Sequence, residues 1–342
     1  MRKPTIGEVA ERAQVAASTV SRVVNGGYAS MKVKARVKQA IRELGYTPSA
    51  SARNLRMGRT GTIGIVAKTT QGAWFNQVLN GMEQGLAGKQ VSMLLGSINT
   101  DGKYELGAIR AWIDEERVDG LVFAHPGKPE VELMSAAAKV GLPMAFVAPD
   151  ELFPRGHSFG GENKQAGKAV ATLLVDLGHK TFAFAGGPQS SQDTQDRLAG
   201  LREELTERGL ELPTEQVTFA ETYFADEGIG HAERWLAMPR EQAPTAVVLG
   251  NDPMALGFMR VLQQNGVKIP EDVSVVGFDG LPEAGLCWPG LTTAAQPAQQ
   301  MGADAVAAVL RQLQHPSSGS ASSAKYPMTL IVRESTGPAP KR

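Results

Sequence analysis

Few nucleophilic or metal-ligating side chains of this 342-residue chain are spaced for catalysis. Residues 156–160 (GHSFG) have the Gly-x-Ser-x-Gly spacing that places a serine on a sharp strand-to-helix turn in hydrolases. They follow a proline-containing loop instead of a predicted strand, so we do not expect Ser158 to be a nucleophile. The five histidines show no metal-ligand spacing, and no glycine-rich phosphate loop ends in Gly-Lys-Ser/Thr. We therefore expect neither an enzyme nor a bound metal or cofactor.

Cationic side chains gather at the start of the chain. Residues 1–60 contain 12 Lys and Arg against 3 Asp and Glu, a net charge of +9, and the remaining residues carry −9. A basic segment on an acidic body is typical of a protein that binds nucleic acid with one domain. The alternative is a solvated basic tail, and the helical pattern of this segment argues against it.

Three short helices are predicted in the basic segment. Thr5 and Glu8 have the spacing of a capping box that starts the first helix. Ser30 can cap the third helix, and Gly45 can end it. Apolar residues recur at intervals of three and four in each helix and can form one small core: Ile6, Val9, Ala10 and Ala13, then Val20, Val23 and Val24, then Val33, Val37, Ile41 and Leu44.

From Thr62 onward, short apolar runs alternate with amphipathic helices. Such alternation predicts parallel sheets built from strand-helix-strand units. About 270 residues form two lobes more naturally than one sheet. The Ser-rich residues 316–324 are predicted to be a loop. The predicted strands are residues 63–66, 91–95, 120–123, 144–147, 182–184, 246–249 and 273–276.

The sequence resembles the lactose/galactose repressor family of transcription regulators over nearly its whole length. The resemblance is carried by residues 5–13 (TIGEVAERA), 19–25 (TVSRVVN), 45–48 (GYTP), 52–55 (ARNL), 61–64 (GTIG), 251–257 (NDPMALG), 269–279 (IPEDVSVVGFD) and 291–293 (LTT). It implies an all-α helix-turn-helix domain at 1–47, a hinge at 48–60, and a two-lobed α/β core with parallel sheets, like that of periplasmic binding proteins, at 61–337. The expected first lobe is about 61–160 and 295–322, and the second about 161–294 and 323–335.

The resemblance places the second helix in the DNA major groove. Ala17, Ser18 and Arg22 are then expected to face base edges, and Arg22 can donate two hydrogen bonds to a guanine. Hydroxyl and amide side chains are better suited to phosphates, which position a protein without specifying sequence. The residues expected to make these contacts are Thr19, Ser21 and Asn25.

The hinge is expected to enter the minor groove. Leu55 matches the family residue that wedges between base steps and kinks the duplex. Ala52 and Thr5 complete the residues assigned to DNA. Because two hinges must meet at one site, we expect a homodimer on a pseudo-palindromic, double-stranded operator.

Two residues of the helix-turn-helix depart from the family pattern. Gln14 stands where a glycine is usual, and Ala16 stands where a serine usually caps the second helix. If the backbone at Gln14 requires a positive φ, a side chain there costs about 1 kcal/mol, and the lost cap costs about as much. We expect the motif to form with reduced stability.

Polar residues at the ends of predicted strands are candidates for an effector site. Arg197, Asn251 and Asp279 match effector-binding positions of the family, and their side chains suit the hydroxyls of a polar ligand. The first lobe departs from the pattern, since Thr69 replaces a common Asp and Gly72-Ala73 replaces Asn-Pro; this weakens the case for a standard sugar. The predicted effector site comprises Thr69, Phe75, Arg197, Tyr223, Asn251 and Asp279.

These predictions describe a cytoplasmic, ligand-responsive transcription regulator, a repressor controlled by a small polar metabolite such as a sugar. No secretory signal and no run of about 18 apolar residues is found, and the single Cys287 excludes an intrachain disulfide. The alternative is a small-molecule binding protein in transport or signalling with the same core. The basic segment and the missing signal argue against it.

Overall fold

The computed structural model describes residues 4–24, 26–47, 58–100, 103–104, 106–150, 153, 155–316 and 321–341. They fall into two compact units, Met1–Thr60 and Gly61–Arg342, which we call the head and the core. Three residues assigned to DNA from the sequence, Asn25, Ala52 and Leu55, lie outside the described residues.

Three helices make up the described head: α1 (Ile6–Ala13), α2 (Ala17–Val24) and α3 (Met31–Leu44). The predicted capping box is present, because Glu8 N donates to Thr5 Oγ1 at 3.3 Å and Thr5 N donates to Glu8 Oε2 at 2.6 Å. Ser30 caps α3, and Gly45 ends it with a φ of 62°. The three helices bury one small core of Val9, Ala10, Ala13, Val20, Val37 and Ala40.

The turn between α1 and α2 has the positive φ at Gln14 on which the expected strain depends. This residue has a φ of 53° and a ψ of 51°, the left-handed conformation. Its N–H bonds to the carbonyls of Ala10 and Glu11, so the backbone is held there by the end of α1. A residue with a Cβ costs about 1–2 kcal/mol in this conformation.

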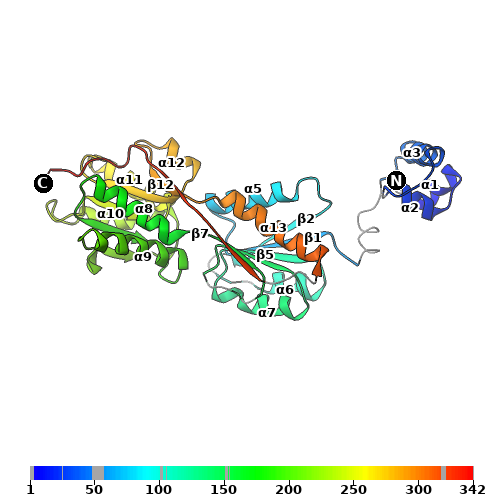
Figure 1. The fold of residues 1–342 in the computed structure, drawn as a ribbon, viewed down its shortest axis with the longest axis horizontal. Helices are drawn as coiled ribbons and strands as arrows, with labels where there is room; N and C mark the ends of the chain where they lie inside the picture. Colours follow the sequence, from blue (N-terminus) through cyan, green and yellow to red (C-terminus); the bar gives the residue numbers. More distant parts are fainter. Residues whose placement is uncertain are drawn as a thin grey trace. The chain divides into compact units, whose positions relative to one another are not determined.

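Each lobe of the core contains one six-stranded sheet (Figure 1). The first lobe has the order β13-β7-β6-β5-β1-β2, and the second has the order β14-β12-β11-β10-β8-β9. Adjacent strands in both sheets are parallel except β12 and β14. The first sheet contains β1 (Thr62–Ala67), β2 (Ser92–Ser97), β5 (Gly120–Ala124), β6 (Met144–Val147), β7 (His157–Gly161) and β13 (Ser322–Tyr326). The second contains β8 (Phe182–Gly186), β9 (Val217–Phe219), β10 (Ala246–Leu249), β11 (Ser274–Asp279), β12 (Thr292–Ala295) and β14 (Thr329–Ile331), and a separate pair is β3 (Asn99–Thr100) and β4 (Lys103–Tyr104).

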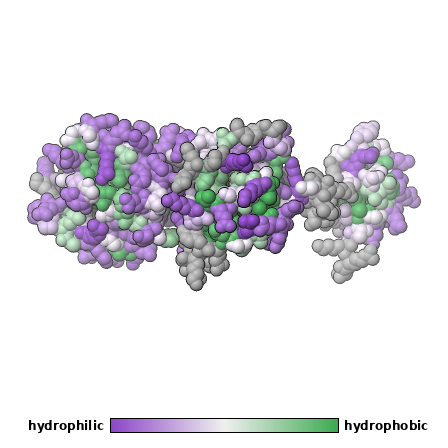
Figure 2. Space-filling view, turned by 90° about the horizontal axis from the view of Figure 1, so that it is seen from below, coloured by the Kyte–Doolittle hydropathy of each residue, from purple (hydrophilic) through white to green (hydrophobic). Residues whose placement is uncertain are grey.

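Helices cover both faces of each sheet, which buries the strands on both sides. In the first lobe, α5 (Ala73–Leu86) and α13 (Ala298–Gln314) lie side by side on one face, and α6 (Gly107–Asp114) and α7 (Val131–Lys139) cover the other (Figure 1). In the second lobe, α10 (Ala225–Leu236) and α11 (Asp252–Gln264) cover one face and α8 (Asn163–Asp176) and α9 (Gln192–Glu207) the other; α12 (Pro282–Leu286) follows β11. The face of the molecule seen in Figure 2 is mostly hydrophilic, with apolar residues showing between.

Glycines set the spacing of α5 and α13. A Cβ added at Gly81 would lie 1.9 Å from the carbonyl oxygen of Gln299, and one at Gly302 would lie 2.1 Å from that of Val78. The two backbones therefore touch, and only residues without side chains permit this approach. This packing joins the start of the first lobe to a segment more than 200 residues later in the chain.

The structure corrects the predicted lobe boundaries. We expected the second lobe to resume at residue 323, but Ser322–Tyr326 pairs in parallel with β7 and belongs to the first sheet. Residues 157–161, which were not among the predicted strands, form β7, and β13 begins at Ser322, inside the segment 316–324 that was predicted to be a loop. Both segments are rich in Ser or Gly, and β13 is an exposed edge strand, so neither has the apolar run by which the other strands were found.

The chain passes between the lobes three times within the core. It crosses after β7, after β12 and after β13. The crossings lie close together, because a Cβ added at Gly161 would be 3.0 Å from Met328 Sδ and 3.3 Å from Gln296 Oε1. No helix among the described residues is long and apolar enough to span a membrane.

Replacing Gln14 by Gly should stabilise the head by about 0.5–1 kcal/mol. Glycine adopts the left-handed conformation without the steric cost of a Cβ, but it loses more conformational entropy on folding, which offsets part of the gain. Amide hydrogen exchange in α1 and α2 of the full chain should slow about two- to fivefold. Gly45→Ala is the matched control of opposite sign at φ 62° and should accelerate exchange. Unchanged or faster exchange in Gln14→Gly would show that this turn is not strained.

Candidate functional site

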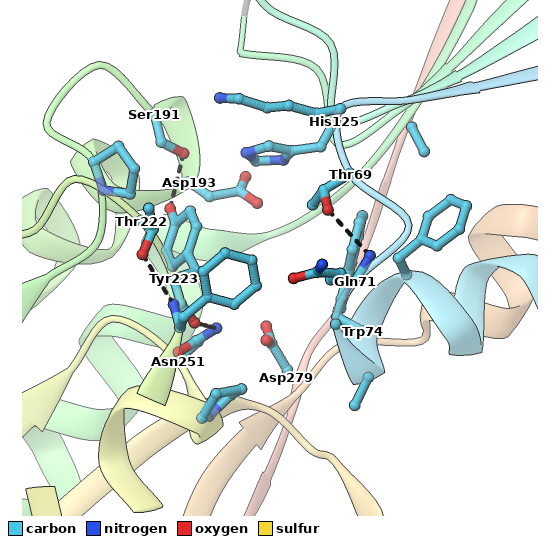
Figure 3. Close-up of a pocket in the computed structure, with 18 of the residues that line it drawn as sticks. Thr69, Gln71, Trp74, His125, Ser191, Asp193, Thr222, Tyr223, Asn251 and Asp279 are labelled. Atoms are coloured by element: carbon cyan, nitrogen blue, oxygen red, sulfur yellow. Dashed lines mark hydrogen bonds between the residues drawn. The ribbon is translucent and has the colours of Figure 1, made fainter. Parts of the chain in front are cut away.

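A cavity of about 540 Å³ lies between the two lobes of the core (Figure 3). Its walls are the residues that follow the carboxyl ends of β1, β5, β6, β8, β9, β10, β11 and β12. This is where ligands bind in open α/β sheets. The structure brings all six predicted effector residues to this cavity: Thr69, Phe75, Arg197, Tyr223, Asn251 and Asp279.

Arg197 is a buried cation at the base of the cavity, with only 2% of its surface exposed. Its Nε donates to Asn163 Oδ1 at 2.7 Å, and its Nη1 donates to the carbonyl of Gly250. Its guanidinium carbon lies 4.6 Å from the centre of the Phe278 ring, a cation–π contact. Its Nη2 lies 3.7 Å from Asp279 Oδ1 and 3.9 Å from Asp193 Oδ2, which neutralises the charge at distances longer than a hydrogen bond.

Asp279 ends β11 in a conformation that only a tight surrounding structure can hold. Its φ is 106°, a region that residues with a Cβ rarely adopt. Gln296 Nε2 donates to Asp279 Oδ1 at 2.8 Å. Burial raises the pKa of Asp279 to about 6, while Arg197 opposes the rise.

Asp252 lies directly behind this turn and has no exposed surface. Its carboxylate accepts hydrogen bonds from Leu281 N at 2.7 Å and from Thr293 Oγ1 at 2.6 Å. It therefore ties the start of α11 to the turn after Asp279 and to β12. Burial, with a smaller contribution from the Asp279 carboxylate, raises the pKa of Asp252 to about 8.

Tyr223 forms the wall of the second lobe. Its hydroxyl donates to Ser191 Oγ at 2.9 Å and lies 2.7 Å from Thr194 Oγ1, and burial raises its pKa to about 12. Asn251 donates from Nδ2 to the Tyr223 carbonyl at 3.1 Å and caps α11 by accepting from Met254 N. Because both ends of the Asn251 amide are engaged, its first role in this structure is to hold the wall in place.

The first lobe contributes Thr69, Gln71, Trp74 and His125 (Figure 3), and also Asp150. Thr69 Oγ1 accepts from Gln71 N at 3.1 Å, so the hydroxyl that replaces the family's common carboxylate is used in its own loop. The His125 ring lies edge-on to Trp74, with centroids 6.1 Å apart.

Two contacts join the lobes across the cavity. The His125 ring of the first lobe lies edge-on to the Tyr223 ring of the second, with centroids 6.0 Å apart. Asp150 Oδ1 accepts from Gln192 N, the first residue of α9, at 3.3 Å. A carboxylate at a helix N-terminus is stabilised by the unpaired amides there.

The sequence reasoning did not assign several cavity residues. His125 and Asp150 follow β5 and β6, two strands that were predicted. Because ligands bind at the carboxyl ends of parallel strands, these two residues could have been predicted from the sequence. Asp193 lies one helical turn before Arg197 on α9, so it could have been predicted to lie on the same face of the helix as Arg197. Gln296 follows β12, which was not predicted as a strand, and the sequence carries no local signal for it.

The described core offers little support for chemistry of other kinds. Ser158 lies inside β7 and is 5% exposed, which is not the exposed turn that a nucleophilic serine requires. Among the residues described, no group of three or more His, Cys, Asp or Glu could hold a metal ion.

In the head, α2 presents the predicted base-reading residues to solvent. Ala17, Ser18 and Arg22 are exposed, whereas Thr19 and Ser21 are partly buried. Thr5 is exposed, and its hydroxyl is used in the capping box. A Cβ at Gly27 would lie 2.7 Å from Arg22 Cγ, so the glycine gives the Arg22 stem room at the end of α2.

Comparisons with known proteins agree with this arrangement. The family model described as bacterial regulatory proteins, lacI family, matches residues 5–49, and the model of a periplasmic binding protein-like domain matches residues 171–336. The ribose operon repressor of Haemophilus influenzae is 30% identical over 338 residues, 97% of this chain and 98% of that protein. The transcriptional repressor PurR of Vibrio parahaemolyticus is 33% identical over 315 residues, 90% of this chain and 92% of that protein. A crystal structure of the lac repressor dimer bound to operator and the anti-inducer ONPF matches with a TM-score of 0.83 and 26% identity, covering 98% of this chain and 100% of that chain.

Asp252→Asn should change how the stability of the protein depends on pH. The folded-state pKa of Asp252, about 8, lies above the usual value of 3.8 for an aspartate. The folded protein therefore binds a proton that the unfolded chain releases, and its stability rises as the pH falls through 8. The difference in unfolding free energy, wild type minus variant, should increase by about 1 kcal/mol from pH 9 to pH 7 in denaturant titrations. A pH-independent difference would contradict the raised pKa.

Proposed function

Because the chain belongs to the lacI family of bacterial regulatory proteins, we propose that the cavity of its core binds a small polar effector that sets the affinity of its head for DNA. The chain is a ligand-responsive, DNA-binding transcription regulator, as its relatives over nearly its whole length are. The observation that carries the assignment of the site is the convergence of six residues, scattered from position 69 to position 279, on one cavity between two lobes.

The coupling between ligand and DNA follows from the position of the cavity. A ligand that contacts residues of both lobes binds one inter-lobe angle better than others and shifts the population toward it. The three chain crossings beside Gln296 are the points about which the lobes can turn. The change in lobe angle would alter the spacing of the two hinge segments, residues 48–60, in a dimer. Either an inducer or a corepressor can act in this way.

The proposed DNA complex is a homodimer on a pseudo-palindromic operator. The lac repressor was solved as a dimer bound to operator. We assign Ala17, Ser18 and Arg22 to base edges, on the support of their exposure along α2. The remaining DNA contacts are assigned from the resemblance alone: Thr5, Thr19, Ser21, Asn25, Ala52 and Leu55.

The proposed direction of control is repression. The curated relatives include repressors of a ribose operon and the repressor PurR. A protein that binds operator DNA works where the chromosome lies, so we propose that this chain acts in the bacterial cytoplasm.

DNA selection from a random duplex pool tests the head. The full chain should enrich a near-palindromic site, and log affinity should fall steeply with log salt. Arg22→Ala should reduce the preference for the selected site over random duplex by about 5- to 100-fold, since a bidentate contact to guanine contributes about 1–3 kcal/mol.

Arg22→Lys is the matched control for the charge. Arg22→Lys retains the positive charge and most of the salt dependence of DNA affinity. It loses the planar guanidinium that donates two hydrogen bonds, and with it the preference for the selected site over random duplex. No enriched site with the wild-type chain would favour the alternative, a binding protein without a DNA role.

Arg197→Lys should uncouple the ligand from the DNA. The lysine keeps one positive charge among Asp193 and Asp279 but cannot reproduce the bonds to Asn163 and Gly250. The variant should lose stability, since these buried bonds are broken, and where it still binds the selected operator the effector should no longer alter the affinity. A retained effector response in operator-binding titrations would remove Arg197 from the site.

A further inference from the structure

The first residue of the core is held by the strands on both sides of it. Gly61 N donates to Asp119 Oδ2 at 2.7 Å, and Ser92 N donates to the Gly61 carbonyl at 2.8 Å. Asp119 immediately precedes β5, Ser92 begins β2, and β1 lies between those two strands in the sheet (Figure 1). The chain is therefore fixed from both sides at the point where it enters the core after the segment 48–60.

Asp119 holds two consecutive residues of the entering chain. Its carboxylate accepts from Gly61 N, and its own N–H donates to the Thr62 carbonyl at 2.8 Å. Gly61 has a φ of 67°, in the left-handed region that glycine adopts most readily, so the chain turns sharply just before β1 begins. A hydrogen bond to an ionised acceptor is roughly twice as strong as one between neutral groups. The Asp119 carboxylate therefore holds this turn more firmly than a neutral acceptor would.

The position of Asp119 is set by the core and not by the chain that it holds. The preceding residue, Val118, is buried. A Cβ added at the following residue, Gly120, would lie 2.5 Å from Val309 Cγ1. Because packing fixes the residues on both sides of it, the partly exposed Asp119 presents its carboxylate from a rigid base.

The strands that meet at this anchor end at the effector cavity. β5 is buried along its whole length and β1 from Ile63 onward, and the two pair in parallel. β5 runs from Asp119 at its amino end to His125 at its carboxyl end. The His125 ring lies edge-on to Tyr223 of the second lobe. Because closely packed strands move together, the anchored Gly61 turns with the edge of the cavity as one body.

We propose that Asp119 is a positioning residue for the DNA-binding head: its bond to Gly61 N fixes the direction in which the chain leaves the core. In a dimer on a pseudo-palindromic operator, two such exits set the distance and the rotation between the heads. The operator spacing that the protein accepts then depends on the orientation of the first lobes. This inference rests on the proposed function and adds to it a residue that does not line the effector cavity.

Operators of altered spacing test the proposal. The near-palindrome selected by the full chain is compared with derivatives that have one base pair inserted or removed at the centre, which rotates one half-site against the other by about one-tenth of a helical turn. The wild-type chain should bind these derivatives about tenfold or more weaker, and we call this ratio of affinities the spacing penalty. Asp119→Ala removes the acceptor, so its spacing penalty should be smaller by about threefold or more.

Two variants supply the matched controls. Asp119→Asn removes the same negative charge as Asp119→Ala, but its amide oxygen can still accept from Gly61 N, so the spacing penalty should stay within about twofold of the wild-type value. Asp272→Ala removes a comparable bond in the second lobe, where Asp272 Oδ2 accepts from Lys268 N at 2.8 Å. It should leave the spacing penalty unchanged.

Hydrogen exchange at Gly61 shows whether the bond is lost. The Gly61 amide should exchange about tenfold or more faster in Asp119→Ala than in the wild-type chain, and near the wild-type rate in Asp119→Asn. If Asp119→Ala does not fold, Asp119→Ser takes its place, because the serine oxygen lies one atom closer to the backbone than the carboxylate oxygens. A role confined to stability would lower the melting temperature and leave the spacing penalty unchanged.

Three results would overturn the proposal: the wild-type chain shows no spacing penalty, Asp119→Ala keeps the full penalty, or Asp119→Asn loses it as Asp119→Ala does. Operator selection separates such a failure from failure of the proposed function. A chain that enriches an operator but gives any of these results remains a regulator whose head is positioned in another way. A chain that enriches no operator loses the regulatory role, and the role of Asp119 with it.

Discussion

The core is organised around one buried cation. Arg197 is 2% exposed, and a guanidinium can be kept there only if other groups satisfy its donors and balance its charge. Asn163, at the first crossing, and Gly250, after β10, accept its hydrogen bonds, while Asp193 and Asp279 supply the balancing charge. One side chain thereby fixes the relative positions of α8, α9, β10 and β11. The groups proposed to bind the effector are therefore held in place because the charge of Arg197 must be compensated.

The same region contains a strained residue and an unpaired buried polar group, both of which have an unfavourable free energy. Asp279 has a φ of 106°, Asp252 is a buried carboxyl group behind it, and Gln296 Oε1 has no hydrogen-bond partner. Strained and unsatisfied groups gather at functional sites because the surrounding packing supports them. The three crossings run through this cluster, so the groups proposed to contact the ligand are also those about which we propose that the lobes turn. On this proposal, ligand recognition and lobe movement depend on the same contacts.

The head and the core are stabilised in different ways. The head buries six small apolar residues and is stabilised by helix caps, and it keeps a left-handed Gln14 that costs it stability. The residues proposed to read base edges, Ala17, Ser18 and Arg22, are exposed and depend on the position of one helix. The core buries two sheets on both faces, and its site exists only because distant strand ends meet. Residues exposed along one helix depend on local structure, whereas a cavity between two lobes depends on the whole fold.

The sequence by itself determined the helices of the head, the caps Thr5, Ser30 and Gly45, and the alternation of strands and helices, because these depend on local periodicity. Six residues of the cavity were expected from the family resemblance and from the rule that ligands bind at the carboxyl ends of parallel strands. Only the tertiary structure decided that β13 belongs to the first lobe and that Gln296 reaches the cavity. It also revealed that Trp74 Nε1 is unpaired and that Asp252 supports Asp279. Those facts follow from pairings between segments far apart in the chain, and no local pattern of residue types records such pairings.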